Sequence, residues 1–192
     1  MKTLALILGL LAISTSGVRA EGNFATKLML TDLSASIASE LHINNAINWK
    51  VGEFSEYDMK AMFGSLGTMK KQATSEQGNA IWIKEQTSGM MGNKTIEILI
   101  DRADGHIVEY REDGQKKDMP DQKLEIISQE HTSVTVPAGT FEAIHITAKT
   151  EQVKKLEIWA NPRDITLDGT AKMAIDTGML PVTVELTKFG GK

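Results

Sequence analysis

Few residues of this chain stand in a pattern that could support catalysis or metal binding. The chain has no cysteine, which excludes disulfides, thiolate nucleophiles and cysteine-ligated metals. Residues 64–67, GSLG, lack the G-x-S-x-G spacing of a serine nucleophile. The four histidines show no H-x-H or H-E-x-x-H spacing, so a metal site would need three of them to converge through folding. We therefore predict no catalytic residue, no metal site and no cofactor. The histidines are His42, His106, His131 and His145.

Acidic residues are numerous but evenly scattered along the chain. Glycoside hydrolysis needs two carboxylates that face each other across a cleft, one of them with a raised pKa. Scattered acids are more typical of a soluble surface. An exported hydrolase with an unrecognised site is therefore the third interpretation, and a cleft that gathers a histidine and two carboxylates would favour it. The acids concerned are Glu109, Glu112, Glu125, Glu130, Glu142, Glu157 and Glu185.

Methionine and tryptophan are the residues that best suit an apolar ligand. Met59 and Met62 have an M-x-x-M spacing, which could bind Cu(I), but no histidine lies nearby in the sequence. The methionines are better suited to an adaptable apolar surface. The tryptophans fall on three separate predicted strands, where they would either pack in the core or form the aromatic floor of a concave sheet. The predicted apolar ligand contacts are Trp49, Trp82, Trp159, Met90 and Met91.

Residues 1–20 have the pattern of a cleaved secretory signal peptide. Lys2 precedes an apolar run over residues 4–13, and Val18-Arg19-Ala20 ends the segment with short side chains at the positions read by a signal peptidase. The run is about half the length that a bilayer-spanning helix needs. No cysteine follows the cleavage point, which argues against a lipid anchor. An exported protein without disulfides favours the periplasm of a Gram-negative bacterium.

The negative net charge of the chain argues against some kinds of binding partner. The formal net charge is −4, and it becomes −6 without the leader, which carries Lys2 and Arg19 but no acidic residue. Phosphate contacts need clustered lysine and arginine, so we expect no nucleic-acid partner. Docking on anionic lipid through charge is disfavoured for the same reason, so any membrane contact is expected to be transient.

The remaining residues, 21–192, predict a single β-rich domain with an N-terminal helix at residues 24–46. Apolar residues at spacings of two to four indicate the helix, and alternation of apolar with polar residues indicates strands after it. Residues 59–74 fit either a short helix or a strand broken by Gly64 and Gly67. Asp104-Gly105 and Asp113-Gly114 indicate tight turns, so neighbouring strands are expected to be antiparallel. About eight or nine strands, drawn from ten strand-like segments, would form a curved antiparallel sheet, either a half-barrel or an open barrel. The strand-like segments are 47–58, 80–87, 95–100, 106–111, 123–130, 132–136, 141–149, 155–160, 170–175 and 182–188.

The most distinctive segment is residues 134–143, VTVPAGTFEA. It predicts a strand, a turn in which Pro137 fixes φ and Gly139 allows positive φ, and a second strand that starts on the core aromatic Phe141. Together with the later strand that ends in Trp159, this order resembles a group of bacterial exported proteins with a VPAGTF hairpin. The group is similar to the periplasmic lipoprotein carriers and receptors, in which a curved antiparallel sheet holds acyl chains. The resemblance implies that architecture and apolar ligands, and it carries over no binding residue.

These observations favour a non-catalytic periplasmic binding protein. Its concave sheet is expected to hold an apolar ligand, a lipid or a lipoprotein acyl chain. The alternative is an envelope protein-interaction or structural module, in which an edge strand accepts a strand of another envelope protein.

Overall fold

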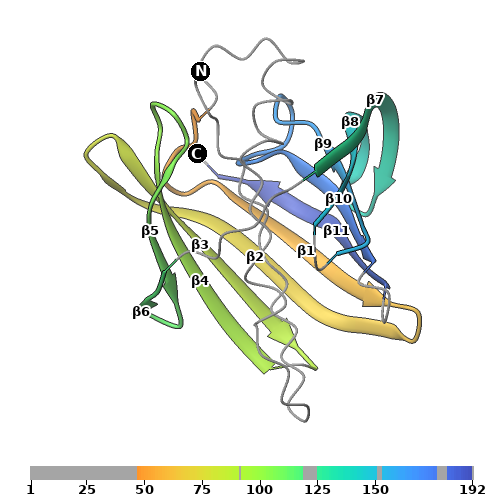
Figure 1. Cartoon of the computed structure of the whole chain (residues 1–192), viewed down its shortest axis with the longest axis horizontal. Helices are drawn as coiled ribbons and strands as arrows, with labels where there is room; N and C mark the ends of the chain where they lie inside the picture. Colours follow the sequence, from red (N-terminus) through yellow and green to blue (C-terminus); the bar gives the residue numbers. More distant parts are fainter. Residues whose placement is uncertain (1–46, 91, 119–124, 151–152, 177–180, 192) are drawn as a thin grey trace.

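The computed structural model describes residues 47–90, 92–118, 125–150, 153–176 and 181–191, which form one antiparallel sheet of eleven strands (Figure 1). The predicted signal peptide, the predicted helix at 24–46, His42 and Met91 lie outside these residues, and the single domain over 21–192 stays a prediction. None of the described residues belongs to a helix long and apolar enough to cross a membrane. The strands are β1 (Phe54–Ala61), β2 (Gly64–Gln77), β3 (Ala80–Gly89), β4 (Gly92–Asp101), β5 (Ile107–Glu112), β6 (Gln115–Lys116), β7 (Glu125–Val136), β8 (Gly139–Lys149), β9 (Lys155–Ala160), β10 (Thr170–Asp176) and β11 (Pro181–Gly190).

The first and last strands join the two halves of the sheet. The strand order is β6-β5-β4-β3-β2-β1-β11-β10-β9-β8-β7, so every neighbouring pair except β1 and β11 is also consecutive in the chain. The sheet bends strongly enough that β7 contacts β10 and β11, although two strands or more separate it from them. It remains open, with β6 and β7 at its edges. The predicted curved antiparallel sheet is confirmed in this open form.

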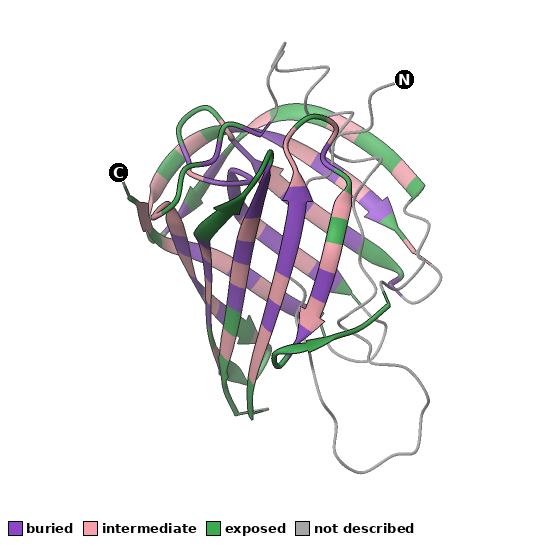
Figure 2. Cartoon of the chain, turned by 90° about the vertical axis from the view of Figure 1, so that its left-hand side faces the viewer, coloured by how far each residue is buried: buried purple, intermediate pink, exposed green. Residues whose placement is uncertain are grey.

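Alternation along the strands gives the sheet a buried inner face and a wetter outer face (Figure 2). Two apolar clusters cover the inner face. The C-terminal cluster gathers buried residues mainly of β1, β2 and β7–β11, including Tyr57, Met69, Ile146, Leu156, Ile158, Met173 and Leu186. The N-terminal cluster lies over β2–β5 and comprises Ile47, Trp49, Ala73, Ile81, Ile83, Ile96, Ile98, Ile100, Tyr110 and Leu167.

Several predicted element boundaries differ from those observed. Residues 59–74 belong to the β1–β2 hairpin and not to a helix, because their apolar residues alternate across a pleated sheet. The strand predicted at 47–58 begins only at Phe54, so Trp49 precedes the first strand. The two strands predicted at 123–130 and 132–136 are one continuous strand, β7. The sheet has eleven strands, more than the eight or nine that the turn signals indicated.

Two glycines allow the first two hairpins to pack closely. Gly67 on β2 is paired with Gly89 on β3, and Gly67 has a φ of 142°. A Cβ at Gly67 would lie 2.1 Å from the backbone oxygen of Ser88, and a Cβ at Gly89 would lie 2.0 Å from that of Leu66. Any side chain here would force the ends of the β1–β2 and β3–β4 hairpins apart.

The predicted VPAGTF hairpin is present between β7 and β8. Val136 pairs with Gly139, whose φ is 146°, as the turn prediction requires. The Ala138 amide donates to the Leu186 carbonyl at 3.0 Å, which ties the turn to β11. Phe141 meets Phe189 edge to face, with 5.9 Å between ring centroids. The motif therefore closes the bent C-terminal half of the sheet.

Candidate functional site: a buried polar cluster between two apolar clusters

A group of buried polar side chains lies on the inner face between the two apolar clusters. Ser55, Lys71 and Glu85 stand opposite one another on β1, β2 and β3, because the register pairs Ser55 with Lys71 and Lys71 with Glu85. Residues directly opposite in an antiparallel pair have Cβ atoms about 5 Å apart. Tyr57 on β1 and Asp168 from the loop between β9 and β10 complete this polar cluster.

The centre of the polar cluster is an ion pair that is almost fully buried. Lys71 Nζ donates to Asp168 Oδ2 at 2.5 Å, and the two side chains are 1% and 2% exposed. Asp168 Oδ1 accepts from the amide of Thr170 at 3.1 Å. Desolvating two charges costs several kcal/mol per ion, so a pair of this kind tends to define a conformation more than it adds stability.

The loop that carries Asp168 is held in one conformation. Leu167 has a φ of 59° and Gly169 a φ of 73°, both left-handed. A Cβ at Gly169 would lie 2.3 Å from the backbone nitrogen of Pro162, so only glycine fits. Thr166 Oγ1 donates to the Phe54 carbonyl at 2.7 Å, which fastens the loop to β1. The same loop places Leu167 in the N-terminal cluster.

Tyr57 lies beside the ion pair, on the side of the C-terminal cluster. Its hydroxyl donates to the Thr170 carbonyl at 3.2 Å, and its ring centroid lies 5.5 Å from Lys71 Nζ. Burial raises the pKa of Tyr57 well above its ordinary value, and the Asp168 carboxylate adds to this rise. The phenol therefore stays protonated and acts as a fixed donor.

Glu85 is the member of the polar cluster with unused hydrogen-bonding capacity. It is 4% exposed, and its Oε1 atom has no hydrogen-bond partner among the described residues. Burial raises its pKa to about 8, a rise that Lys71 opposes and Asp168 increases. The side chain is therefore mostly a neutral acid at pH 7, which keeps an unpaired charge off the inner face.

The sequence-based interpretation did not single out any member of this polar cluster. Met69, Lys71 and Ala73 alternate on β2, and Ile81, Ile83 and Glu85 alternate on β3. A charged residue that continues an apolar stripe is a signal for a buried polar group, and it was present in both strands. No comparable signal marks Asp168, which lies in a loop 97 residues from Lys71.

Of the four predicted ligand contacts that the structure describes, only Trp49 lies with the inner face. It is 7% exposed and packs in the N-terminal cluster. Its carbonyl accepts from Arg102 Nη2 at 2.7 Å, and the same guanidinium nitrogen lies 2.6 Å from Glu76 Oε1. Arg102 thus holds the segment before β1 over the sheet.

Trp82 and Trp159 lie on the outer face, so the three tryptophans do not form one floor. Each stands between two buried neighbours on its strand and points the other way. The Arg111 guanidinium lies 4.5 Å from the Trp82 ring centroid, and the His145 ring stacks on Trp159 at 4.3 Å. Met90 is exposed at the β3–β4 turn, away from the inner face.

The three described histidines, His106, His131 and His145, do not converge on a metal site. His145 lies on the outer face, with Nδ1 3.0 Å from Glu130 Oε1 and Nε2 3.3 Å from Glu157 Oε1. It is therefore a histidine with two carboxylates, but it belongs to a cross-strand row of side chains on the sheet surface. His106 pairs with Asp104 at 2.6 Å near an exposed turn. Within the described ranges, no three histidine or acidic side chains are grouped to hold a metal ion.

Comparison with known proteins supplies no family assignment. No protein-family model matches the chain, and no curated protein matches it significantly. The chain is similar to a hypothetical protein from Chlamydia trachomatis at 10% identity and a TM-score of 0.49, over 75% of this chain and 89% of that chain. It is also similar to a candidate exported protein with a YmcC-like fold from Bacteroides fragilis at 12% identity and a TM-score of 0.45, over 74% of this chain and 97% of that chain. Neither is described with a ligand or a reaction.

Proposed function

We propose that this protein is a non-catalytic periplasmic binding protein that holds an apolar ligand, the acyl chain of a lipid or lipoprotein, against the inner face of its sheet. The observation that supports the proposal is the construction of the N-terminal cluster. Its floor consists mainly of isoleucines from β3 and β4, whereas Ile47, Trp49 and Leu167 reach it from outside the strands. Ile47 and Trp49 come from the segment before β1, and this part of the cover can be exchanged for a ligand, whereas Leu167 belongs to the loop fixed by the Lys71–Asp168 ion pair.

Among the described residues, few polar contacts attach the cover at Ile47 and Trp49 to the sheet. The Trp49 carbonyl is held by Arg102, and the next tie to the sheet is the Gly52 amide, which donates to the Ala73 carbonyl at 2.9 Å. Displacing Ile47 and Trp49 would therefore break one charged hydrogen bond and expose only apolar surface. An acyl chain restores the apolar contacts without leaving a polar group unpaired.

The floor under this cover is suited to a linear hydrocarbon. Ile81 pairs with Ile100 and Ile83 with Ile98, so branched side chains form a continuous strip across two strands. Glu85 continues the strip toward the Lys71–Asp168 ion pair. Because its carboxyl group is mostly neutral at pH 7, it places no charge beside the ligand.

The three tryptophans allow a direct test of this site. Three variants, each retaining only Trp49, Trp82 or Trp159 with phenylalanine at the other two positions, would be produced with the leader and purified from the periplasm of a Gram-negative host. We expect a brominated fatty acid to quench Trp49 fluorescence and to leave Trp82 and Trp159 unchanged, because only Trp49 lies with the inner face. Equal quenching of all three, or none of Trp49, would reject the site. Failure of the full chain to reach the periplasm and lose residues 1–20 would reject the predicted localisation.

A second function is favoured by the edge strand β7. This strand has 12 residues, and the described part of the chain places no strand on the side away from β8. Such an edge can accept a strand of an envelope protein. A photo-crosslinking residue at Ile127, which is 54% exposed, should then give one discrete adduct in envelope extracts. The same residue at Val108 on β5 is the control, and identical adducts from both positions would reject strand addition.

A further inference from the structure

The three most exposed large hydrophobic side chains of the described residues lie at two neighbouring turns. Met62 and Phe63 form the turn between β1 and β2 and are 85% and 69% exposed, and Met90 in the turn between β3 and β4 is 78% exposed. The other exposed large hydrophobics, Val51, Val108 and Ile127, reach only 46–54% and lie apart from one another in the sequence. We refer to Met62, Phe63 and Met90 as the hairpin tips.

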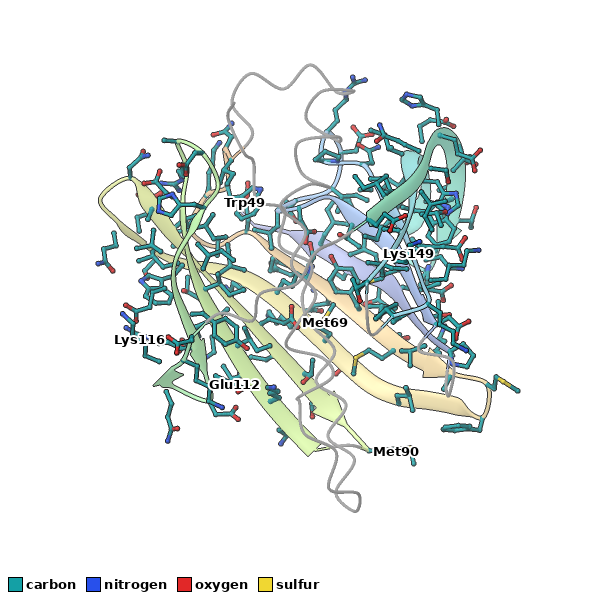
Figure 3. All side chains as sticks on the ribbon, viewed as in Figure 1. Trp49, Met69, Met90, Glu112, Lys116 and Lys149 are labelled. Carbon is teal, nitrogen blue, oxygen red and sulfur yellow. The ribbon has the colours of Figure 1, made fainter. Side chains whose placement is uncertain are left out.

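The β1–β2 and β3–β4 turns lie at the same end of the sheet (Figure 1). Gly67 pairs with Gly89, and the Met90 amide donates to the Leu66 carbonyl at 2.9 Å, so the β3–β4 turn lies against β2. The β1–β2 turn lies a few residues further along β2, about 10 Å at the rise of a strand. Figure 3 places Met90 at the opposite end of the molecule from Trp49, so the hairpin tips are separate from the proposed ligand site.

No carboxylate lies near the hairpin tips in sequence. Residues 59–72 and 86–96 contain no aspartate or glutamate, in a chain with 25 of them. The lysines that flank the tips are already paired, Lys60 with Glu185 at 3.0 Å and Lys94 with Glu112. The turns thus present apolar side chains with little net charge around them.

These properties suit a lipid bilayer better than a protein partner. A stable protein interface buries about 800 Å² on each side from about 20–30 residues, far more than three side chains on two narrow turns provide. A bilayer interface deforms around protruding apolar side chains, and a few of them give weak, reversible attachment. From this geometry we infer that the hairpin tips insert into the interfacial region of a lipid bilayer and dock the protein reversibly through apolar contacts. This inference goes beyond the proposed function, since it concerns side chains outside the inner face.

The absence of cysteine permits a site-specific test. Phe63→Cys, Met90→Cys and the control Val108→Cys would each be labelled with an environment-sensitive fluorophore on the periplasmically purified protein. With phosphatidylcholine vesicles, we expect the emission at positions 63 and 90 to rise about threefold and to shift to the blue, and position 108 to stay unchanged. The response should persist in 0.5 M salt, at which charge-driven binding is screened to about 4–5 Å.

A second variant distinguishes insertion from other causes. Replacing both Met62 and Phe63 by serine should weaken vesicle binding reported from position 90 by at least about tenfold, whereas Val108→Ser should leave it unchanged. Insertion is rejected if position 108 responds like positions 63 and 90, or if salt abolishes the response. It is also rejected if the same blue shift arises without vesicles at high protein concentration, since a second copy of the chain would then cover the tips.

Discussion

The two apolar clusters of the inner face are closed in different ways. The C-terminal cluster is closed mainly by the sheet, because β7 bends back onto β10 and β11 and brings Val134 and Val136 into the cluster; Val153 and Ile165 join it from the loops on either side of β9. The N-terminal cluster is closed by Ile47, Trp49 and Leu167, which come from segments outside the strands. The hydrogen-bonded strand pairs from β7 to β11 hold the C-terminal cluster closed. At the N-terminal cluster, side-chain packing and the Arg102 guanidinium hold Ile47 and Trp49 in place. One half therefore has a permanent core, whereas in the other half Ile47 and Trp49 form the cover that we propose a ligand replaces.

The polar cluster between them links the two halves, and breaking it should have the largest effect. Lys71→Met leaves Asp168 charged, buried and unpaired, so we expect a loss of about 3–5 kcal/mol in the free energy of unfolding in urea. Lys60→Met, which removes the surface pair with Glu185, is the matched control and should cost about 1 kcal/mol or less. Similar losses from both variants would show that the polar cluster does not join the halves.

Because Glu85 belongs to the polar cluster, its titration should make the free energy of unfolding depend on pH. Its pKa is raised from 4.5 to about 8 in the folded protein, so the folded state retains a proton that the unfolded state releases between these values. Stability therefore falls as pH rises from about 5 to 8 and levels off above that range. Glu85→Gln cannot ionise, so its unfolding free energy relative to the unmodified protein should increase by roughly 3 kcal/mol over this window. A difference that does not change with pH would contradict the burial of the carboxyl group.

Truncating one isoleucine in each apolar cluster tests whether the C-terminal cluster is permanent core and the N-terminal cluster has an exchangeable cover. Ile146→Ala removes a fully buried side chain from the C-terminal cluster and should cost about 2–5 kcal/mol. Ile47→Ala in the exchangeable cover should cost about 2 kcal/mol less, because the segment before β1 can readjust over the space. Chemical denaturation of both variants measures the difference, and equal costs would mean that both halves are permanent core.

Removing the hydrogen bond between Arg102 and the Trp49 carbonyl should have the smallest effect. Arg102→Ala removes the hydrogen bond to the Trp49 carbonyl, which is worth about 1 kcal/mol at this partly exposed position. Hydrogen exchange should become about fivefold faster for the Gly52 amide and stay unchanged in β8 and β9. Faster exchange throughout the sheet would indicate a global loss of stability and not local opening.

Much of the architecture could be predicted from the chain because strand alternation is a local property. The antiparallel strands after residue 80 and the turn at Pro137 and Gly139 follow from apolar spacing and turn chemistry. Residues 59–74 are ambiguous in the sequence because Gly64 marks the turn before β2, whereas Gly67 lies inside β2 without ending it. The extent of β7 was missed because the predicted break at residue 131 has no counterpart in the pairing with β8.

Less of the polar cluster than of the fold could be predicted from the sequence. Lys71 and Glu85 continue apolar stripes, so their burial could have been proposed from spacing. Their environment could not, because it depends on Asp168, which reaches them only after β1 pairs with β11 and the loop before Gly169 turns over the inner face. The aromatic floor differs from this case, since strand parity is local: the apolar neighbours of Trp82 and Trp159 on their strands already indicated that both tryptophans face the other side.

By itself, the sequence determined a mostly β chain with antiparallel hairpins, no thiol chemistry and a leader-like N-terminus, since these depend on composition and on neighbours a few residues apart. Only the tertiary structure decided which charged residues are buried, where the Trp49 side chain packs and which apolar residues stay exposed on neighbouring turns. The physical reason is that these properties depend on curvature and on pairing between residues about 100 positions apart. Local spacing carries no information about contacts at that distance.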